Sequence, residues 1–267
     1  MKQLILTVTI IINFGICSYA QTKDGSNQSS EKTRTFRMTK KAVKIHIDLG
    51  RAVIEGHSGN EIIFSLQDST KKIDEKAKGL RSINGLGLED NTGLGINVTE
   101  VSGVIQVSQM NSADPSNIKI LVPYGMVISF DHQSKFGKAV YFKNIQGEIE
   151  VSTNENSIHL ENVTGPVSIK TVQGNVEAIL PLNVKGPISI VSIYGNVDVA
   201  LPQTTRSTVK LNAKFGEILV AEEFKLELQK QEPQPRYTNQ ITGKLNGGGL
   251  NIDLRSDNGK IYLRTKK

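Results

Sequence analysis

The chain has 267 residues, a net charge of +6 and 24 Gly, with 5% aromatic residues and no Trp. Such a Gly-rich, β-branched composition is typical of many short strands joined by tight turns and argues against a helical bundle. The basic residues are scattered along the chain, a pattern that predicts a solvated surface rather than a nucleic-acid site.

The first 20 residues have the pattern of a secretory signal peptide. Lys2 gives a basic start, Leu4 to Ile16 form an apolar run, and Ser18-Tyr19-Ala20 supplies the small residues of a cleavage site. This run is too short to span a bilayer, and no later stretch approaches the ~20 apolar residues that a membrane helix needs. We therefore expect a mature chain that begins at Gln21, carries a charge of +5 (6 − 1, after loss of Lys2) and has no transmembrane segment. Its location would be the periplasm, the cell surface or the medium.

Cys17 is the only cysteine, and it lies within the predicted signal peptide. A lipid anchor on Cys17 is the alternative to ordinary cleavage, but Ile16 stands where a lipobox has a small residue. We favour ordinary cleavage, which leaves the mature chain without disulfides, a thiolate metal site or a cysteine nucleophile.

The N-terminal half shows strand patterns with irregular spacing. Residues 21–35 are polar and predict a disordered leader, with order beginning near Phe36. Apolar and polar residues alternate from Val43 to Asp48, as in a half-buried strand. Between Ser69 and Leu80 the pattern favours one short helix, with Ile73, Ala77 and Leu80 on one face.

From Gly137 onward a short phrase recurs, a Gly followed by apolar residues at the second and fourth places. The segment from Gly165 to Pro181 is nearly repeated from Gly186 to Pro202. Such a repeat predicts a solenoid, in which one unit stacks on its copies. The phrases open at Gly137, Gly147, Asn156, Gly165, Gly174, Gly186, Gly195, Ser207 and Gly216. Two phrases make a coil of 18 to 21 residues, and we expect Gly at the openings because the turn needs a positive φ, for which Asn156 is the next best residue.

The phase of the strands divides the repeat residues between a core and a polar surface. Those expected inward are Ile149, Val151, Ile158, Leu160, Val167, Ile169, Val176, Ala178, Ile188, Ile190, Val197, Val199, Val209, Leu211, Ile218 and Val220. Those expected outward are Glu148, Glu150, His159, Ser168, Glu177, Ser189, Asp198 and Lys210. A polar outer face is expected when coils stack without helices covering them.

The fold class predicted is all-β, a single β-solenoid (β-helix) over residues 36–267. It is irregular to about residue 130 and regular over 137–220, followed by a loop over 221–248 and a closing coil over 249–264. We expect this last coil to form the end of the stack, with Arg264, Lys266 and Lys267 discouraging edge-to-edge association. Handedness cannot be read from the pattern.

Three motifs resemble those of the putative-adhesin family of bacterial β-strand-repeat envelope proteins, a family of unknown function. They are Ile118 to Gly125 leading into the repeats, the repeated Gly phrases, and Leu245 to Gly249 followed by Ser256 to Leu263. The resemblance covers about Val43 to Leu263. It implies an exported β-solenoid with a structural or adhesive role, and it supplies no catalytic residues.

The sequence has no recognisable nucleophile elbow, phosphate-binding loop or histidine metal motif, so we expect no cofactor and no metal centre. One constellation arises if strands two apart in sequence pair, because His159, Glu177 and Asp198 then form an outward row on adjacent strands. Strands lie about 4.7–4.9 Å apart, so the two carboxylates could share a proton or hold Ca²⁺. We favour a solvated polar row, with Asn175 and Asn196 forming a hydrogen-bonded ladder beside it.

The leading prediction is a non-enzymatic structural or adhesin-like protein of the bacterial envelope or surface, whose partner is a protein or glycan of that surface. The alternative is a polysaccharide-acting β-helix enzyme or a glycan-binding module that uses Glu177 and Asp198. The shortage of aromatic residues and the lack of an evident basic partner beside the acids argue against the enzyme.

Overall fold

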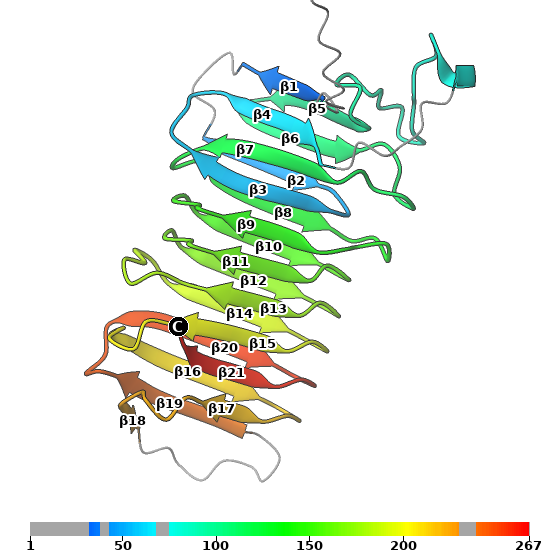
Figure 1. The fold of residues 1–267 in the computed structure, drawn as a ribbon. Helices are drawn as coiled ribbons and strands as arrows, with labels where there is room; N and C mark the ends of the chain where they lie inside the picture. Colours follow the sequence, from blue (N-terminus) through cyan, green and yellow to red (C-terminus); the bar gives the residue numbers. More distant parts are fainter. Residues whose placement is uncertain (1–31, 38–42, 68–74, 230–238, 267) are drawn as a thin grey trace, which may run out of the picture. The chain divides into compact units, whose positions relative to one another are not determined.

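The computed structural model describes residues 32–37, 43–67, 75–229 and 239–266. The predicted signal peptide and most of the predicted leader lie outside these residues. The described strands all fall in one compact unit, residues 31–267, and form two long sheets (Figure 1). Within the described ranges, no helix is long and apolar enough to cross a membrane.

Ten strands form the first sheet, which we call sheet A, and eleven form the second, sheet B. In spatial order, sheet A contains β1 (Thr33–Phe36), β4 (Ile62–Leu66), β7 (Ile118–Pro123), β3 (Ala52–His57), β9 (Val140–Lys143), β11 (Ile158–Glu161), β13 (Val176–Ile179), β15 (Val197–Leu201), β21 (Ile261–Thr265) and β17 (Ile218–Val220). Sheet B contains β18 (Leu226–Leu228), β19 (Asn239–Leu245), β16 (Ser207–Ala213), β20 (Leu250–Ser256), β14 (Ile188–Ser192), β12 (Val167–Thr171), β10 (Ile149–Thr153), β8 (Val127–His132), β2 (Lys44–Asp48), β6 (Val104–Gln109) and β5 (Ile96–Val101).

The regular region alternates between the two sheets. Each sheet B strand is followed by a sheet A strand, and we call such a pair a coil. The strands of successive coils pair in parallel, as in β10 with β12 and β11 with β13. The chain is therefore all-β with two long, mostly parallel sheets, an architecture consistent with the predicted solenoid.

The core lies between the sheets and follows the predicted phase. Fourteen of the residues expected inward, from Ile149 to Leu211, are buried, while Ile218 and Val220 at the end of the stack are only partly buried. Phe130 and Phe142 add a T-shaped aromatic contact, with ring centroids 6.0 Å apart. The period-2 pattern was thus sufficient to identify the buried face of each strand.

Two local predictions were wrong. β1 begins at Thr33, inside the stretch expected to be a disordered leader, because it pairs antiparallel with β4. The expected helix is reduced, in its described part, to a 3₁₀ turn at Glu75–Ala77, and Leu80 is 75% exposed. Leu80 therefore has no apolar surface to pack against, and a short helix in water is not stable by itself.

The order of the coils in space differs from their order in sequence, which we did not predict. The C-terminal coil, β20–β21, does not lie at the end of the stack. It is inserted between β14–β15 and β16–β17 and pairs in parallel with both (Figure 1). At the other end, β2–β3 lies between β8–β9 and β6–β7. The sequence repeat identifies the coils but not their order in space, because the strands of every coil can pair in parallel with those of another coil.

Antiparallel strands occupy three of the four ends of the described sheets; the exception is β17, which pairs in parallel with β21. β4 and β1 follow β7 in sheet A, and β5 follows β6 in sheet B. At the opposite end β19 and β18 extend sheet B beyond β16, within the stretch expected to be a loop. Strands in the opposite direction interrupt the parallel edge that would otherwise be offered to further coils.

The turn from a sheet B strand to a sheet A strand, which we call the first corner, explains the repeated glycines. None of the glycines at the predicted phrase openings, all of them described, has a positive φ, so our expectation was wrong. A Cβ on Gly174 would instead overlap the carbonyl oxygen of Asn156, and one on Gly195 would overlap that of Gly174. The requirement is close approach of stacked backbones, and Asn156 is buried rather than left-handed.

A buried hydroxyl completes the first corner in three coils, those of Thr171, Ser192 and Ser256. Ser192 Oγ accepts from Gly195 N at 2.9 Å and donates to the carbonyl of Gly174 in the neighbouring coil at 2.8 Å. Ser256 makes the same pair of bonds to Gly259 N and to the carbonyl of Gly195, both at 2.9 Å. The sequence signal for this corner is a Ser or Thr three residues before the opening Gly, which we did not recognise in the repeat.

The turn from a sheet A strand back to sheet B, the second corner, has the same close approach, since a Cβ on Gly165 would overlap the carbonyl oxygen of Gly147, but it adds a left-handed residue. Asn144 and Asn162 adopt positive φ here, both at 54°. Asn162 Nδ2 donates to Asn144 Oδ1 at 2.7 Å, on the protein surface. Left-handed φ is tolerated by Asn, so this corner holds the conformation that we had assigned to the glycines.

Candidate functional site

The predicted outward row forms on sheet A. His159 on β11 aligns with Glu177 on β13, and Glu177 aligns with Asp198 on β15. The same register brings Tyr141 of β9 to one end of the row and Tyr262 of β21 to the other. The three predicted residues are therefore brought together on consecutive strands, because each occupies the third place after its phrase opening.

Each carboxylate of the row contacts a nitrogen base. His159 Nδ1 lies 3.3 Å from Glu177 Oε2, and Arg264 Nε donates to Asp198 Oδ1 at 2.7 Å. The hydrogen bond to Asp198 raises the pKa of Arg264 above its usual value, and the charges of Asp198 and Glu177 add to this effect. Our expectation that the acids lack a basic partner was wrong, because the inserted C-terminal coil supplies Arg264.

An aromatic stack borders the row. The rings of Tyr141 and His159 lie 4.6 Å apart at 14° to one another, so they are nearly parallel. Tyr141 remains 38% exposed. Together they form a flat apolar edge beside the carboxylates.

A second outward row runs beside the first, two residues further along each strand. It contains Lys143 on β9, Glu161 on β11, Ile179 on β13, Ala200 on β15 and Arg264 on β21. Lys143 Nζ lies 3.2 Å from Glu161 Oε2. The short Ala200 and the apolar Ile179 thus separate two ion-paired groups.

A hollow of about 200 Å³ lies over these two rows. It is lined by Tyr141, Lys143, His159, Leu160, Glu161, Glu177, Ala178, Ile179 and Arg264. Ligand pockets usually measure about 300–1,000 Å³, so the hollow is smaller than a typical ligand pocket. We call it the sheet A hollow.

Further charged groups lie on sheet A next to this site. Lys119 Nζ on β7 lies 3.0 Å from Glu55 Oε2 on β3, and Asn144 Nδ2 donates to Glu55 Oε1 at 3.3 Å. The hydrogen bond from Lys119 lowers the pKa of Glu55, against the opposing effect of its partial burial. The outer face of sheet A therefore carries ion pairs along much of its length.

The asparagine ladder predicted beside the row is confirmed. Asn175 Oδ1 accepts from Asn196 N at 2.8 Å, and Asn196 Oδ1 accepts from Lys260 N at 2.8 Å. The side chains bond to backbone of the next coil and so serve the fold.

At Glu177 and Asp198 we had favoured a solvated polar row over a Ca²⁺ site. Over residues 32–37, 43–67, 75–229 and 239–266, no group of three or more His, Cys, Asp or Glu side chains has the arrangement of a metal site. Glu177 and Asp198 are instead bonded to His159 and Arg264 as described above.

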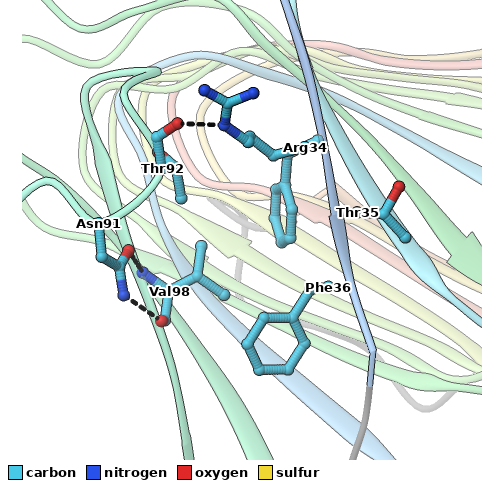
Figure 2. A pocket seen from close by; sticks show the side chains of 7 residues that line it. Arg34, Thr35, Phe36, Asn91, Thr92 and Val98 are labelled. Carbon is cyan, nitrogen blue, oxygen red and sulfur yellow. Dashed lines mark hydrogen bonds between the residues drawn. The ribbon is translucent and has the colours of Figure 1, made fainter.

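A second cavity, of about 260 Å³, lies at the end of the sheets next to β1 and β5 (Figure 2). Its lining includes the apolar Phe36, Phe64 and Val98. Arg34 Nε donates to the carbonyl of Thr92 at 2.8 Å, as Figure 2 shows. Asn91 exchanges two bonds with the backbone of Val98, at 2.7 and 2.9 Å. These polar groups are already hydrogen-bonded within the chain, so the cavity belongs to the packing at this end of the two sheets.

Comparison with known proteins gave structural matches only. No family model and no curated protein matches the chain. Its structure is similar to those of two proteins described as adhesins. A putative cell adhesion protein from Clostridium sporogenes has 12% identity and a TM-score of 0.44, covering 88% of this chain and 100% of that one. A putative adhesin from Bacteroides fragilis has 10% identity and a TM-score of 0.28, covering 89% of this chain and 98% of that one.

Five contributors to the sheet A hollow were missed from the sequence, namely Tyr141, Lys143, Glu161, Ile179 and Arg264. Counting from the phrase openings places Glu161 and Ile179 in one row, so part of the signal was present. Arg264 could not have been placed, because nothing in the repeat shows that β21 pairs with β15.

Proposed function

We propose that the protein is an exported, non-enzymatic structural or adhesin-like module of the bacterial envelope or cell surface. In this proposal the outer face of sheet A binds a partner on that surface. The observation that carries the proposal is the pairing of the outward groups. Asp198 is bonded to Arg264, Glu177 contacts His159, and Glu161 is paired with Lys143. Groups held in this way offer a fixed pattern of donors and acceptors, as a recognition surface requires.

The polysaccharide-acting enzyme is the less supported alternative. Acid–base catalysis needs one carboxyl group that can give a proton and another that can take one. Asp198 is held instead in an ion pair with the guanidinium of Arg264. The small hollow also leaves the row open to water. Both features suit binding better than proton transfer.

Export is supported by the sequence of residues 1–20 alone. Fractionation of the native source with an antibody against the protein, together with N-terminal sequencing, tests it. We expect an envelope or extracellular protein beginning at Gln21. A lipid-modified Cys17 would move the protein to a membrane surface.

Binding and catalysis are tested together with the purified mature protein. We expect saturable binding to isolated cell envelopes, and no new reducing ends or unsaturated products from acidic polysaccharides. Product formation that disappears in Glu177→Gln would establish the enzyme instead, and absence of saturable binding would remove the adhesin-like role.

A further inference from the structure

We propose that the sheet A hollow binds one unit of an uncharged, hydroxyl-rich glycan. The inference rests on the proposed function and names the ligand of the same face. It is carried by three features of the hollow, namely its apolar floor, its mixed donors and acceptors, and its balanced charge.

The floor of the hollow comes from the second row. The strand register puts Ile179 and Ala200 between Glu161 and Arg264. Ile179 is 44% exposed although it lies on a face of charged residues. An exposed branched apolar side chain flanked by polar groups suits a sugar ring, which is apolar on its C–H face and polar at its edge. The Tyr141–His159 stack adds a second flat apolar edge.

The paired groups retain hydrogen-bonding capacity. A carboxylate has about four acceptor positions and a guanidinium has five N–H donors. The contact between Asp198 and Arg264 joins one oxygen to one nitrogen, Oδ1 to Nε. A carboxylate and a guanidinium held together in this way can accept from one hydroxyl and donate to its neighbour. Adjacent hydroxyls of a sugar require this combination.

The balance of charge selects against charged ligands. The lining carries two carboxylates, Glu161 and Glu177, and two cations, Lys143 and Arg264. Lys143 is paired with Glu161, and Arg264 with Asp198 beside the hollow. The carboxylates would repel a polyanion, and Arg264 and Lys143 would repel a cation. A ligand without charge avoids both repulsions.

The size of the hollow favours a glycan over a protein partner. Protein interfaces depend on aromatic or Arg side chains that fill deep, fully desolvated pockets. The hollow measures about 200 Å³ and is open to solvent, which suits one sugar unit at a time. From β9 to β15 the face extends over three strand spacings, roughly 14 Å, so neighbouring units of a chain would lie along the same rows.

The test begins with a printed array of neutral oligosaccharides (glucans, galactans, mannans and xylans) and acidic ones (polygalacturonate and sulfated glycans). The purified mature protein is applied at low and at high NaCl. We expect neutral probes to bind, with an affinity that changes less than about twofold between the two salt concentrations, because no ion pair with the ligand is screened. The best neutral probe is then titrated by calorimetry.

Two variants of one coil give a matched comparison. Ile179→Arg on β13 fills the hollow, whereas Ser168→Arg adds the same charge on β12, on the exposed face of sheet B. We expect Ile179→Arg to weaken binding at least tenfold and Ser168→Arg to change it less than twofold. Glu177→Gln, which preserves shape, should weaken binding about tenfold, the effect of losing a hydrogen bond to a charged group. Melting temperatures show that each variant is folded.

The outcomes separate this inference from the proposed function. Equal effects of Ile179→Arg and Ser168→Arg would overturn the assignment of the hollow. Binding only to acidic probes, lost at high salt, would overturn the ligand class. Saturable envelope binding without any neutral glycan binding would refute the inference and leave the proposed function standing. Absence of both kinds of binding would refute both.

Discussion

The two kinds of corner differ in how constant their lengths are. At the first corner, four residues separate the strands at 154–157, 172–175, 193–196, 214–217 and 257–260. At the second corner the connection has five residues at 144–148 and 162–166 but eight at 180–187. From β10 onward the first corner is thus constant in length, and the second accepts additions.

The contacts explain this difference. The first corner has backbone against backbone at Gly174 and Gly195, with a buried hydroxyl bonded across coils. An added residue there would displace both. At the second corner Gly165 likewise packs against the backbone of Gly147, but the residues before the glycine are bonded through exposed side chains, such as Asn162 to Asn144, which can follow a change in the turn. Close stacking is therefore present at both corners, and the room for added residues lies before the glycine of the second corner.

The largest expected effect comes from lengthening each corner by the same amount. Insertion of Gly-Ser between Gln173 and Gly174 would separate Gly174 from Asn156 and from Thr171, and we expect a loss above about 4 kcal/mol. The same insertion between Leu182 and Asn183, where Leu182 is 61% exposed, should cost less than about 1 kcal/mol. Denaturant unfolding of both proteins measures this. Similar losses would contradict the division between the corners.

Gly174→Ala tests close approach at the first corner without changing its length. The new methyl group would overlap the carbonyl oxygen of Asn156, and moving two stacked backbones apart should cost about 3 kcal/mol. Gly85→Ala is the control, because a Cβ at Gly85 meets no atom within 4 Å and its φ is not positive. Thermal and urea melts compare the two. If Gly174→Ala costs no more stability than Gly85→Ala, close approach does not explain the glycine at this corner.

Ser192→Ala removes the hydroxyl but keeps the glycines. Gly195 N and the carbonyl of Gly174 would each lose a buried partner, and we expect a cost of about 1–3 kcal/mol. The matched change Ser168→Ala lies on the exposed face of the same sheet and should stay within about 0.5 kcal/mol. If both changes are neutral in urea unfolding, the hydroxyl ladder does not stabilise the corner.

The smallest effect concerns the second corner and its charged neighbours. Glu55 contacts Asn144 of this corner, and Lys119 lowers the pKa of Glu55 in the folded protein. This stabilisation is present above the ordinary Glu pKa of about 4.3 and is lost as the pH falls through the lower folded value. We expect Glu55→Gln to cost about 0.2–1 kcal/mol at pH 7 and nothing at pH 2. A pH series of urea melts checks this, and a pH-independent difference would assign the cost to packing.

Much of the fold could be predicted because the alternation of apolar and polar residues within each strand shows which face is buried. The alternation around Val176 and Val197 identified the buried face, and the phrase spacing aligned His159, Glu177 and Asp198. The glycines were misinterpreted, because a Gly in sequence does not distinguish a need for positive φ from a lack of space. Only the stacked neighbour, here the carbonyl of Asn156, decides between them.

Only part of the candidate site could be predicted from the sequence. The acidic row depends on coils that are consecutive in sequence, whereas Arg264 reaches Asp198 from a coil 66 residues away. All coils present similar parallel edges, so local pattern does not determine which edge the last coil joins. The spacing of the repeats therefore could not predict that Arg264 is the partner of Asp198.

The inserted C-terminal coil also sets the order in which the structure can be completed. Among the described strands, β16 and β17 join the remainder of the two sheets through β20 and β21. During synthesis from the N-terminus, residues 207–220 are made before the strands that connect them to β14 and β15. The edges of β14 and β15 stay open until residues 250–265 emerge. The final arrangement therefore requires residues 250–265, and loss of them would remove the strands through which β16 and β17 pair with the rest of the two sheets.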